Sequence, residues 1–378
     1  MKDHYRIVII ADTHIGAERR PWLRKIGVTP DKYDQPAAEA MLWASENDAD
    51  MTILAGDMYD RRTPTPNDYI RGHQLAPDLV VTGNHDITAA GRNDALWSHD
   101  NVIRGRGYRY GVDGLHVVGL PWPRWTDWPL NLPCTIESEI AQTREHVLEA
   151  LETRCAEIPV AEPAILVGHA MVSYGNTTPD DPGLLLGKDV VLPYESLTSL
   201  PNIGGVYLGH VHDPSSPAYV GSTQPTDWGE ADQAKSFTVV DITPHGDEYR
   251  WSWVYETRQI PYTTSLNLAS VSDEDFWLDH QHPHGDYDGV RLTWMMREGD
   301  DPEQLTLAER ALRAQHPYVE VIVEHEVKRA ARVETEKPLA TLSPLEQVSV
   351  WLTQRDTPQR DALQVMDQSS IIVSHSKE

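Results

Sequence analysis

The stretch Leu-Val-Val-Thr-Gly-Asn-His-Asp, residues 79–86, is the part of the chain from which its fold and its chemistry are best inferred. Three apolar residues and a threonine predict a short buried strand, and Gly83 permits a tight turn directly after it. Asn84, His85 and Asp86 then follow the carboxyl end of that strand, which is the edge of an open α/β sheet where ligands bind. The same three residue types are common in turns, so this stretch alone also fits an ordinary loop.

The same pattern, an apolar strand followed by a carboxylate or an imidazole, occurs four more times. Residues 5–11, 51–55, 164–167 and 205–208 are rich in aliphatic and β-branched side chains, which is typical of buried strands. Because the carboxyl ends of parallel strands meet at one edge of a sheet, we expect the polar residues that follow to lie together. These residues are Asp12, His14, Asp57, His169, His210 and His212. Five such matches in one chain are not expected by chance.

The segments between these strands indicate how the domain is layered. Helical spacing of apolar residues predicts a helix that starts at Pro36 and ends near residue 48, and further helices near 67–75 and 135–154. Alternation of strand and helix predicts a layered α/β fold. Additional strands are expected near 101–104, 115–119, 217–222, 236–242 and 249–256, and the last three of these are expected to close a second sheet.

The composition changes after about residue 260. Residues 289–294, 303–315 and 318–324 predict a β-α-β unit, and residues 342–353 predict a short amphipathic helix. We therefore expect a main domain over 1–260 and a small second domain over 261–340. Residues 341–378 are expected to form a C-terminal helix and tail that could dock a partner.

Charge and composition limit the classes of function. The 378 residues include 32 Lys and Arg against 58 Asp and Glu, a net charge of −26, which argues against autonomous binding of nucleic acid. A nucleic-acid role would need a local basic track, metal ions or a basic partner. No apolar run is long enough to span a membrane, and the N-terminus lacks signal-peptide features. Cys134 and Cys155 have no metal-ligand or redox spacing, so we expect reduced thiols in a cytoplasmic protein.

The candidate ligands favour a particular metal chemistry. Carboxylates, imidazoles and one amide, without a thiolate, suit Mn²⁺, Fe²⁺ or Zn²⁺. One carboxylate between two histidine-bearing sets can bridge two metals about 4 Å apart, and such a pair activates water and neutralises a phosphoryl group. The sequence therefore predicts metal-assisted hydrolysis of a phosphoester.

The ordered motifs Asp-x-His, Gly-Asp-x-x-Asp, Gly-Asn-His-Asp, Gly-His and Gly-His-x-His resemble the calcineurin-like metallophosphoesterase superfamily over roughly residues 5–215. The resemblance implies a two-sheet sandwich flanked by helices and two divalent ions, Mn²⁺ first, with Mg²⁺, Fe²⁺ or Zn²⁺ as alternatives. It assigns His85 as the catalytic histidine at the substrate phosphate or leaving group, with Asp86 orienting its ring. The implied ligands are Asp12, His14 and His212 for one metal, Asn84, His169 and His210 for the other, and Asp57 as the bridge.

Within that superfamily, further segments are similar to the SbcD nucleases and their meiotic-recombination counterparts. Residues 56–66, 118–124, 219–222 and 228–235 match patterns of that family, and the unit containing residues 319–323 resembles its capping domain. Residues 1–260 would then be the nuclease domain and 261–340 the capping domain. This resemblance implies a Mn²⁺-dependent DNA phosphodiesterase, a 3′→5′ double-strand exonuclease and single-strand endonuclease, in DNA repair and recombination. It also implies a homodimer that works with an SbcC-like ATPase of the SMC type.

Several other residues are weaker candidates, and two other functions stay open. Five arginines on loops near the motifs could hold DNA phosphates, although solvated loop charges explain them equally well. They are Arg19, Arg20, Arg61, Arg62 and Arg92. A stand-alone phosphoesterase that acts on nucleotides or phosphoproteins would fit the acidic charge better. A non-catalytic scaffold would be expected to lack one or more ligands, and none is missing.

Overall fold

The computed structural model describes residues 2–87, 95–107, 109–131, 135–175, 189–231, 233–246, 252–272, 286–297, 300–316 and 318–325. By contacts the chain divides into two compact units, Met1–Thr293 with Glu303–Ile322, and Trp294–Pro302 with Val323–Glu378. Most of the second unit, with the predicted helix at 342–353, lies outside the described residues. The domain boundaries expected at 260 and 340 therefore stay predictions.

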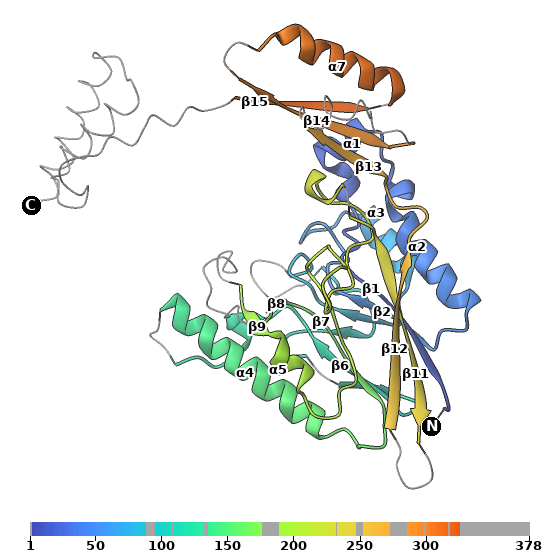
Figure 1. Cartoon of the computed structure of the whole chain (residues 1–378). Helices are drawn as coiled ribbons and strands as arrows, with labels where there is room; N and C mark the ends of the chain where they lie inside the picture. Colours follow the sequence, from blue (N-terminus) through green and yellow to red (C-terminus); the bar gives the residue numbers. More distant parts are fainter. Residues whose placement is uncertain are drawn as a thin grey trace, which may run out of the picture. The chain divides into compact units, whose positions relative to one another are not determined.

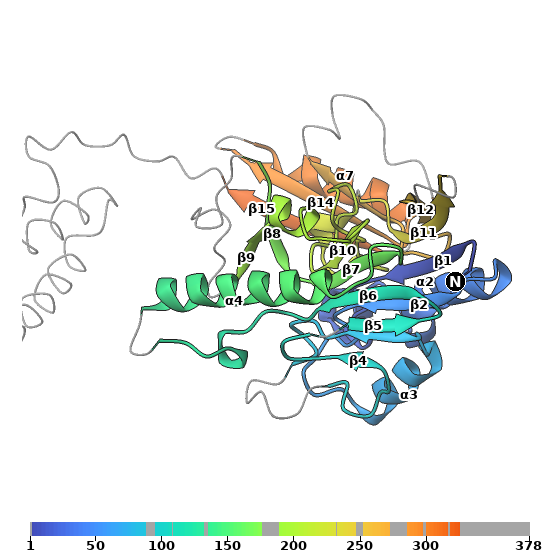
Figure 2. The ribbon, with the colours of Figure 1, turned by 90° about the horizontal axis from the view of Figure 1, so that it is seen from below.

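The two largest sheets lie in the first unit, and most of their strands are labelled in Figures 1 and 2. The six-stranded sheet has the order β12 (Ser252–Pro261), β11 (Ser236–His245), β1 (Tyr5–Ile10), β2 (Met51–Ala55), β3 (Leu79–Val81), β4 (Val102–Ile103). The four-stranded sheet has the order β10 (Val206–Gly209), β7 (Ala164–His169), β6 (Leu115–Leu120), β5 (Arg109–Val112). Pairs β1–β2, β2–β3, β6–β7 and β7–β10 are parallel, so their polar continuations emerge at one edge of each sheet.

The period-2 alternation of β1 explains why the sheets form layers. Ile7 and Ile9 pack in a core that also contains Val167 and Tyr207 from the other sheet. The intervening Val8 and Ile10 pack on the opposite face, in a cluster with residues of α2 (Pro30–Glu46) and α3 (Pro66–Leu75). Helices α4 (Ile136–Ala156) and α5 (Tyr194–Thr198) cover the outer face of the four-stranded sheet. The expected layered α/β sandwich flanked by helices is confirmed.

Helix α2 corrects one expectation, since it begins at Pro30 rather than at Pro36. Thr29 caps the helix by accepting a hydrogen bond from the Lys32 amide at 3.3 Å, which makes Pro30 the first helical residue. Pro36 lies inside the helix, where a proline leaves the carbonyl four residues earlier without its usual donor. That carbonyl, of Lys32, accepts a hydrogen bond from Gln224 Nε2 at 3.3 Å instead.

The second correction concerns the strands after residue 215. Residues 217–222 form no named strand and make only the isolated bridges Leu208↔Tyr219 and Ala11↔Ser222. Strands β11 and β12 exist, but β11 pairs antiparallel with β1, in the register Tyr5↔Ile242, and so both extend the first sheet. The alternating pattern of a strand predicts its existence but not its partner, which is decided by the free edge of β1.

The predicted β-α-β unit is confirmed as β14 (Gly289–Met296), α7 (Pro302–Gln315) and β15 (Val319–His325). These strands continue from β13 (Leu268–Ser272) in a three-stranded sheet of order β13-β14-β15. The remaining elements are short: η1 (Ala17–Arg19), α1 (Pro21–Lys25), η2 (Trp125–Asp127), β8 (Met171–Ser173), β9 (Val191–Pro193) and η3 (Trp228–Glu230). Among the described residues, no helix is long and apolar enough to cross a membrane.

Candidate metal centre

The candidate ligands stand on tight loops directly after the parallel strands. Asp12, His14 and Asp57 adopt positive φ angles of 51°, 43° and 53°, and His210 one of 99°. Residues other than glycine rarely adopt this conformation, and where they do the strain is often found at functional sites. The loops after β1 and β2 support each other, because the His14 amide donates to the Asp57 carbonyl at 3.0 Å.

Two glycines allow these loops to approach closely. A Cβ on Gly83 would lie 2.1 Å from Asp57 Oδ1, and one on Gly56 would lie 2.2 Å from His169 Nδ1. Gly56 also has a φ of +89°, in the region that glycine adopts most easily. The glycines of the two motifs are therefore needed to bring the ligand loops together.

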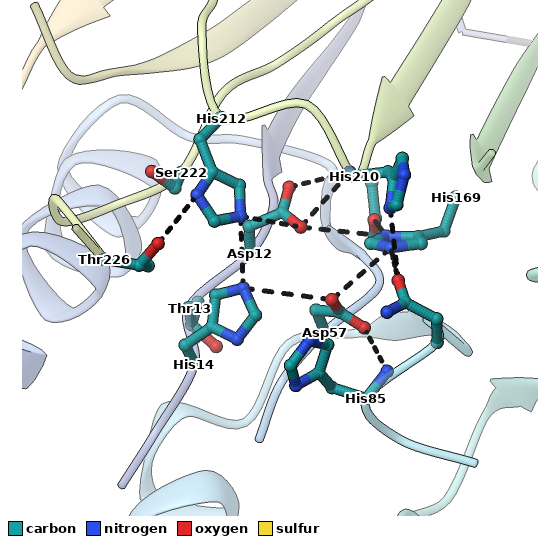
Figure 3. A network of polar contacts seen from close by, with 12 residues as sticks. Asp12, Thr13, His14, Asp57, His85, His169, His210, His212, Ser222 and Thr226 are labelled. Carbon is teal, nitrogen blue, oxygen red and sulfur yellow. Dashed lines mark hydrogen bonds and ion pairs between the residues drawn. The ribbon is translucent and has the colours of Figure 1, made fainter. Parts of the chain in front are cut away.

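The first group of ligands comes from β1 and from the loop after β10. His14 Nε2 lies 3.2 Å from His212 Nε2, and His212 Nε2 lies 3.8 Å from Asp12 Oδ1. Figure 3 shows the two imidazole rings and the carboxylate pointing toward one another. Asp12 is completely buried, and its two oxygens each accept a hydrogen bond from the His210 amide, at 3.1 and 3.0 Å.

The second group comes from the ends of β3, β7 and β10 and meets at the amide oxygen of Asn84. His169 Nε2 lies 2.9 Å and His210 Nδ1 lies 3.2 Å from Asn84 Oδ1. The other ring nitrogen of His169 lies 2.9 Å from the carbonyl of Ala55. The Trp122 ring packs against the His210 ring, with centroids 4.6 Å apart, and closes one side of this group.

Asp57 lies between the two groups. Its Oδ2 is 3.8 Å from His14 Nε2 and 3.5 Å from His169 Nε2, while its Oδ1 accepts a hydrogen bond from the His85 amide at 2.8 Å. Its carboxylate therefore faces one imidazole of each group, as a bridging ligand must. Three groups of residues could each hold a metal ion, because the potential ligand atoms within each group all lie within 4.8 Å of one another. The groups are Asp12–His14–His212, His14–Asp57–His85 and Asp12–Asp57–His169.

The contacts of His169 indicate that a cation belongs in this site. Since Nδ1–H is engaged by the Ala55 carbonyl, Nε2 carries a lone pair, and that lone pair faces the oxygens of Asn84 and Asp57. Acceptors that face one another repel unless a positive charge lies between them. Burial lowers the pKa of both His169 and His210 to about 3, which keeps the rings in the neutral form that binds metal. The residues therefore fit a divalent ion on each side of Asp57.

His85 and Asp86 are placed differently from each other. The His85 ring lies edge-on to His14, with centroids 4.9 Å apart, and its Nδ1 lies 2.8 Å from the Asp60 carbonyl. Asp86 does not contact that ring in the way expected. Its buried carboxylate accepts hydrogen bonds from main-chain amides instead, of Gly83 at 2.9 Å and of Tyr59 at 3.2 Å. Asp86 therefore holds the loops after β2 and β3.

Three residues that support His212 were not among the predicted site residues. His212 Nδ1 lies 2.8 Å from Glu230 Oε1, and Lys235 Nζ donates to Glu230 Oε2 at 2.5 Å. Thr226 Oγ1 donates to Glu230 Oε1 at 2.7 Å. The sequence signal for Glu230 and Lys235 was their match to a family pattern, which did not specify their role.

The arginines expected to contact DNA differ in how they are bound. Arg19 makes a two-pronged ion pair with buried Asp68, at 2.7 and 2.8 Å, and Arg20 is bound to Asp60. Arg61 and Arg62 are exposed. Arg92 lies outside the described residues. A contact with DNA stays a prediction for these residues, and the exposed pair is the more accessible.

Comparisons with known proteins give the family of the chain. The calcineurin-like phosphoesterase family model matches residues 5–214. The chain is 25% identical over 366 residues to the SbcD component of the SbcCD nuclease of Bacillus subtilis, covering 87% of this chain and 88% of that protein. Among similar solved structures is a phosphatase from Mycoplasma pneumoniae, at 11% identity and a TM-score of 0.37, over 69% of this chain and 95% of that one. Another is a dimetal phosphatase from Danio rerio, at 14% identity and a TM-score of 0.38, over 68% of this chain and 99% of that one.

Proposed function

The chain belongs to the calcineurin-like phosphoesterase family, and from that premise we propose that it is a Mn²⁺-dependent phosphodiesterase that cleaves DNA. As a member of that family it is a metal-dependent phosphoester hydrolase with a candidate site for two metals. The DNA substrate rests on one observation, the match with a component of the SbcCD nuclease over 87% of this chain and 88% of that protein. The match extends well past the residues of the catalytic domain model.

The proposed ligands divide between two ions, with Asp57 facing both positions. Asp12, His14 and His212 would hold one ion, and Asn84, His169 and His210 the other. Bound divalent ions would lower the pKa of a water molecule and neutralise charge on the phosphoryl group. The similar distances from Asp57 to His14 and His169 support the bridging role.

His85 is the proposed catalytic residue. Its Nδ1–H is engaged by the Asp60 carbonyl, so that Nε2 is the nitrogen available to substrate. In hydrolysis of a phosphodiester, water adds to phosphorus, the bond from phosphorus to the leaving oxygen breaks, and that oxygen takes a proton. When the ring is protonated, Nε2–H can donate to the phosphate and then to the leaving oxygen.

The proposed partners are inferred from the similarity to the SbcD component of the SbcCD nuclease and from the charge of the chain. A net charge of −26 opposes binding to a polyanion, so we propose a homodimer that meets DNA together with an SbcC-like ATPase. Arg61 and Arg62, exposed after the second motif, are the proposed phosphate contacts of this protein. Replacing both by alanine should weaken DNA binding. The slope of the logarithm of the binding constant against the logarithm of salt concentration should become shallower by about 0.9 for each phosphate contact that is lost.

The test compares hydrolysis of end-labelled duplex DNA and of bis-p-nitrophenyl phosphate in Mn²⁺. His85→Ala is assayed in parallel, with His146→Ala, a histidine on α4 that contacts Pro129 and Trp128, as the matched control. Shortening from 3′ ends that is lost in His85→Ala and kept in the control is the expected result. Hydrolysis of the small ester without cleavage of DNA, across a salt series, would contradict the DNA substrate and favour a small-molecule phosphoesterase.

A further inference from the structure

Arg20 has the contacts of an internal clamp rather than those of a surface cation. Its Nε and Nη2 donate to Asp60 Oδ1 at 3.0 and 2.5 Å, and its Nη1 donates to the Thr226 carbonyl at 2.6 Å. Only 28% of its side chain is exposed, and the Asp60 side chain is 8% exposed. The guanidinium therefore joins the loop after β2 to the segment at Thr226, which lies 206 residues after Arg20 itself, with donors on both edges already engaged.

Each end of this clamp holds a residue of the metal centre. The Asp60 carbonyl lies 2.8 Å from His85 Nδ1, so the position of the Asp60 main chain decides where the His85 ring lies. At the other end, Thr226 Oγ1 lies 3.1 Å from His212 Nδ1 and donates to Glu230. The Thr226 segment is thus already fixed by its own contacts. It provides a rigid anchor against which Arg20 can hold Asp60.

We propose that Arg20 is a positioning residue that fixes the His85 ring toward the metal centre through the Asp60 main chain. This inference rests on the catalytic role proposed for His85. It replaces, for Arg20, the expectation of a contact with DNA phosphates.

The chemistry of the side chain suits this role. A guanidinium presents a rigid fork of donors, so it can hold a carboxylate and a carbonyl at the same time, whereas a lysine ammonium is a flexible point charge. Without Arg20, the nearly buried carboxylate of Asp60 would lose its close cationic partner and would turn toward solvent. Because the Asp60 amide stays bonded to the Ile15 carbonyl at 3.1 Å, the change would act on the carbonyl side of Asp60, and the acceptor for His85 Nδ1–H would move with it.

The test uses bis-p-nitrophenyl phosphate, which has no DNA backbone for an arginine to contact. In Mn²⁺, Arg20→Ala should lower kcat by roughly 10- to 100-fold, the usual cost of losing a residue that supports a catalytic group. KM and the affinity for Mn²⁺, measured by calorimetry, should stay unchanged. Added guanidinium should restore part of kcat, and Arg20→Lys should restore less, because one ammonium cannot span both acceptors.

Arg6 supplies a matched control. It also bonds a carboxylate and a carbonyl, with Nε 2.7 Å from Asp241 Oδ1 and Nη1 2.9 Å from the Asn47 carbonyl, and its side chain is 27% exposed. Arg6 lies near the start of β1, away from the ligand loops at its other end. Arg6→Ala should therefore lower the melting temperature as Arg20→Ala does, without lowering kcat.

A double-mutant cycle with His85→Ala decides whether Arg20 acts through that ring. The loss caused by Arg20→Ala should disappear in the His85→Ala background. An equal loss in both backgrounds, or a loss of DNA binding with unchanged ester hydrolysis, would overturn the inference. If His85→Ala keeps full turnover, the proposed role of His85 fails as well. If it loses turnover while Arg20→Ala does not, only the role of Arg20 fails.

Discussion

The metal centre has two halves, the group Asp12, His14 and His212 and the group Asn84, His169 and His210, and each half holds one of its imidazole rings by different means. On one side, His212 Nδ1 is paired with the carboxylate of Glu230, which is bound in turn by Lys235. On the other side, His169 Nδ1 is paired with the neutral main-chain carbonyl of Ala55. A carboxylate makes an imidazole a more basic ligand than a carbonyl does, so the two metal positions are expected to differ in affinity.

The electrostatics of the two halves differ in the same sense. Although burial raises the pKa of Glu230, the hydrogen bond with His212 and the charges of His212 and Lys235 hold it at about 2. Burial alone lowers the pKa of His212, but its partners Glu230 and Asp12 raise it above the ordinary value. Burial lowers the pKa of His169 and His210 in the other half, and also that of His14 beside His212. Among the four ligand rings, His212 is therefore held by charge, and the other three are kept neutral by burial.

The largest loss of activity is expected from a substitution of Asp57, which lies between the two halves. Asp57→Asn removes the carboxylate whose Oδ2 lies near the Nε2 atoms of both His14 and His169, and it should lower ester hydrolysis by more than about 100-fold, beyond the usual cost of a supporting residue. Metal analysis of the purified variant should give fewer than two ions per chain. Asp241→Asn, which removes a carboxylate paired with Arg6 outside the site, is the control and should keep both ions. Full activity of Asp57→Asn would show that no bridge is needed.

Acidity should weaken metal binding strongly. Burial raises the pKa of the Asp12 carboxyl from 3.8 to about 8, so without metal the folded protein holds a proton there that metal must displace. Metal affinity should therefore fall about tenfold per pH unit below 8, or roughly 100-fold by pH 6.

The same shift predicts how stability depends on pH. An acid with a raised folded pKa binds more protons in the folded than in the unfolded state, so Asp12 by itself makes the metal-free protein less stable as pH rises from 4 to 8. His169 and His210, whose folded pKa values are lowered from 6.5, act in the opposite direction below pH 6.5, so the loss of stability is expected between pH 6.5 and 8. Thermal melts with and without Mn²⁺ should diverge as pH rises. A stabilisation by Mn²⁺ that is the same at pH 6 and pH 8 would contradict this assignment.

Glu230→Gln tests the charged half alone. The amide keeps the shape but not the charge, and the affinity of one of the two metal positions should fall by roughly 10- to 100-fold. A calorimetric titration should then resolve a weakened step and an unchanged step. Because Lys235 loses its anionic partner, Glu230→Gln/Lys235→Met separates this effect from the cost of a buried charge without a counter-charge. An equal loss of affinity in both metal-binding steps would contradict the assignment of Glu230 to one half of the metal centre.

Trp122→Leu tests the other half and should have the smallest effect. The Trp122 ring contacts the His210 and His169 rings, with centroids 4.6 and 5.9 Å away. Aromatic pairs contribute about 0.5–1.5 kcal/mol, which corresponds to a loss of roughly 2- to 12-fold in affinity at this position. Trp125→Leu, an exposed residue of the same loop, is the control. A change in the step assigned to the His212 side would mean that the halves are assigned the wrong way round.

The same contrast explains which parts of the site could be predicted from the sequence. Asp12, Asp57 and Asn84 each follow an apolar run within a few residues, so a local pattern together with the rule for parallel strands places them at one edge. Glu230 supports His212 through a loop that contains no such pattern. Arg20 meets Thr226 over a separation of 206 residues, and no local signal reports that contact.

The fold divides in the same way. Elements with a strong period, such as β2 and α4, were predicted with nearly their observed bounds. The predicted start of α2 was wrong because Pro36 is not the first helical residue, whereas Thr29 caps the helix before Pro30 and Gln224 bonds the carbonyl that Pro36 leaves free. The prediction that β11 belongs to a second sheet was wrong. Which strand it pairs with depends on which sheet has an open edge, and the sequence of the strand itself does not report that.

The metal centre proposed for this protein depends on Asp57 joining two metal positions. Electron paramagnetic resonance of the protein loaded with Mn²⁺ tests it most directly, since two ions bridged by a carboxylate are magnetically coupled and isolated ions are not. The expected result is two Mn²⁺ per chain with a coupled spectrum that reverts to that of isolated ions in Asp57→Asn. One ion per chain, or two ions with uncoupled spectra in the unmodified protein, would contradict it.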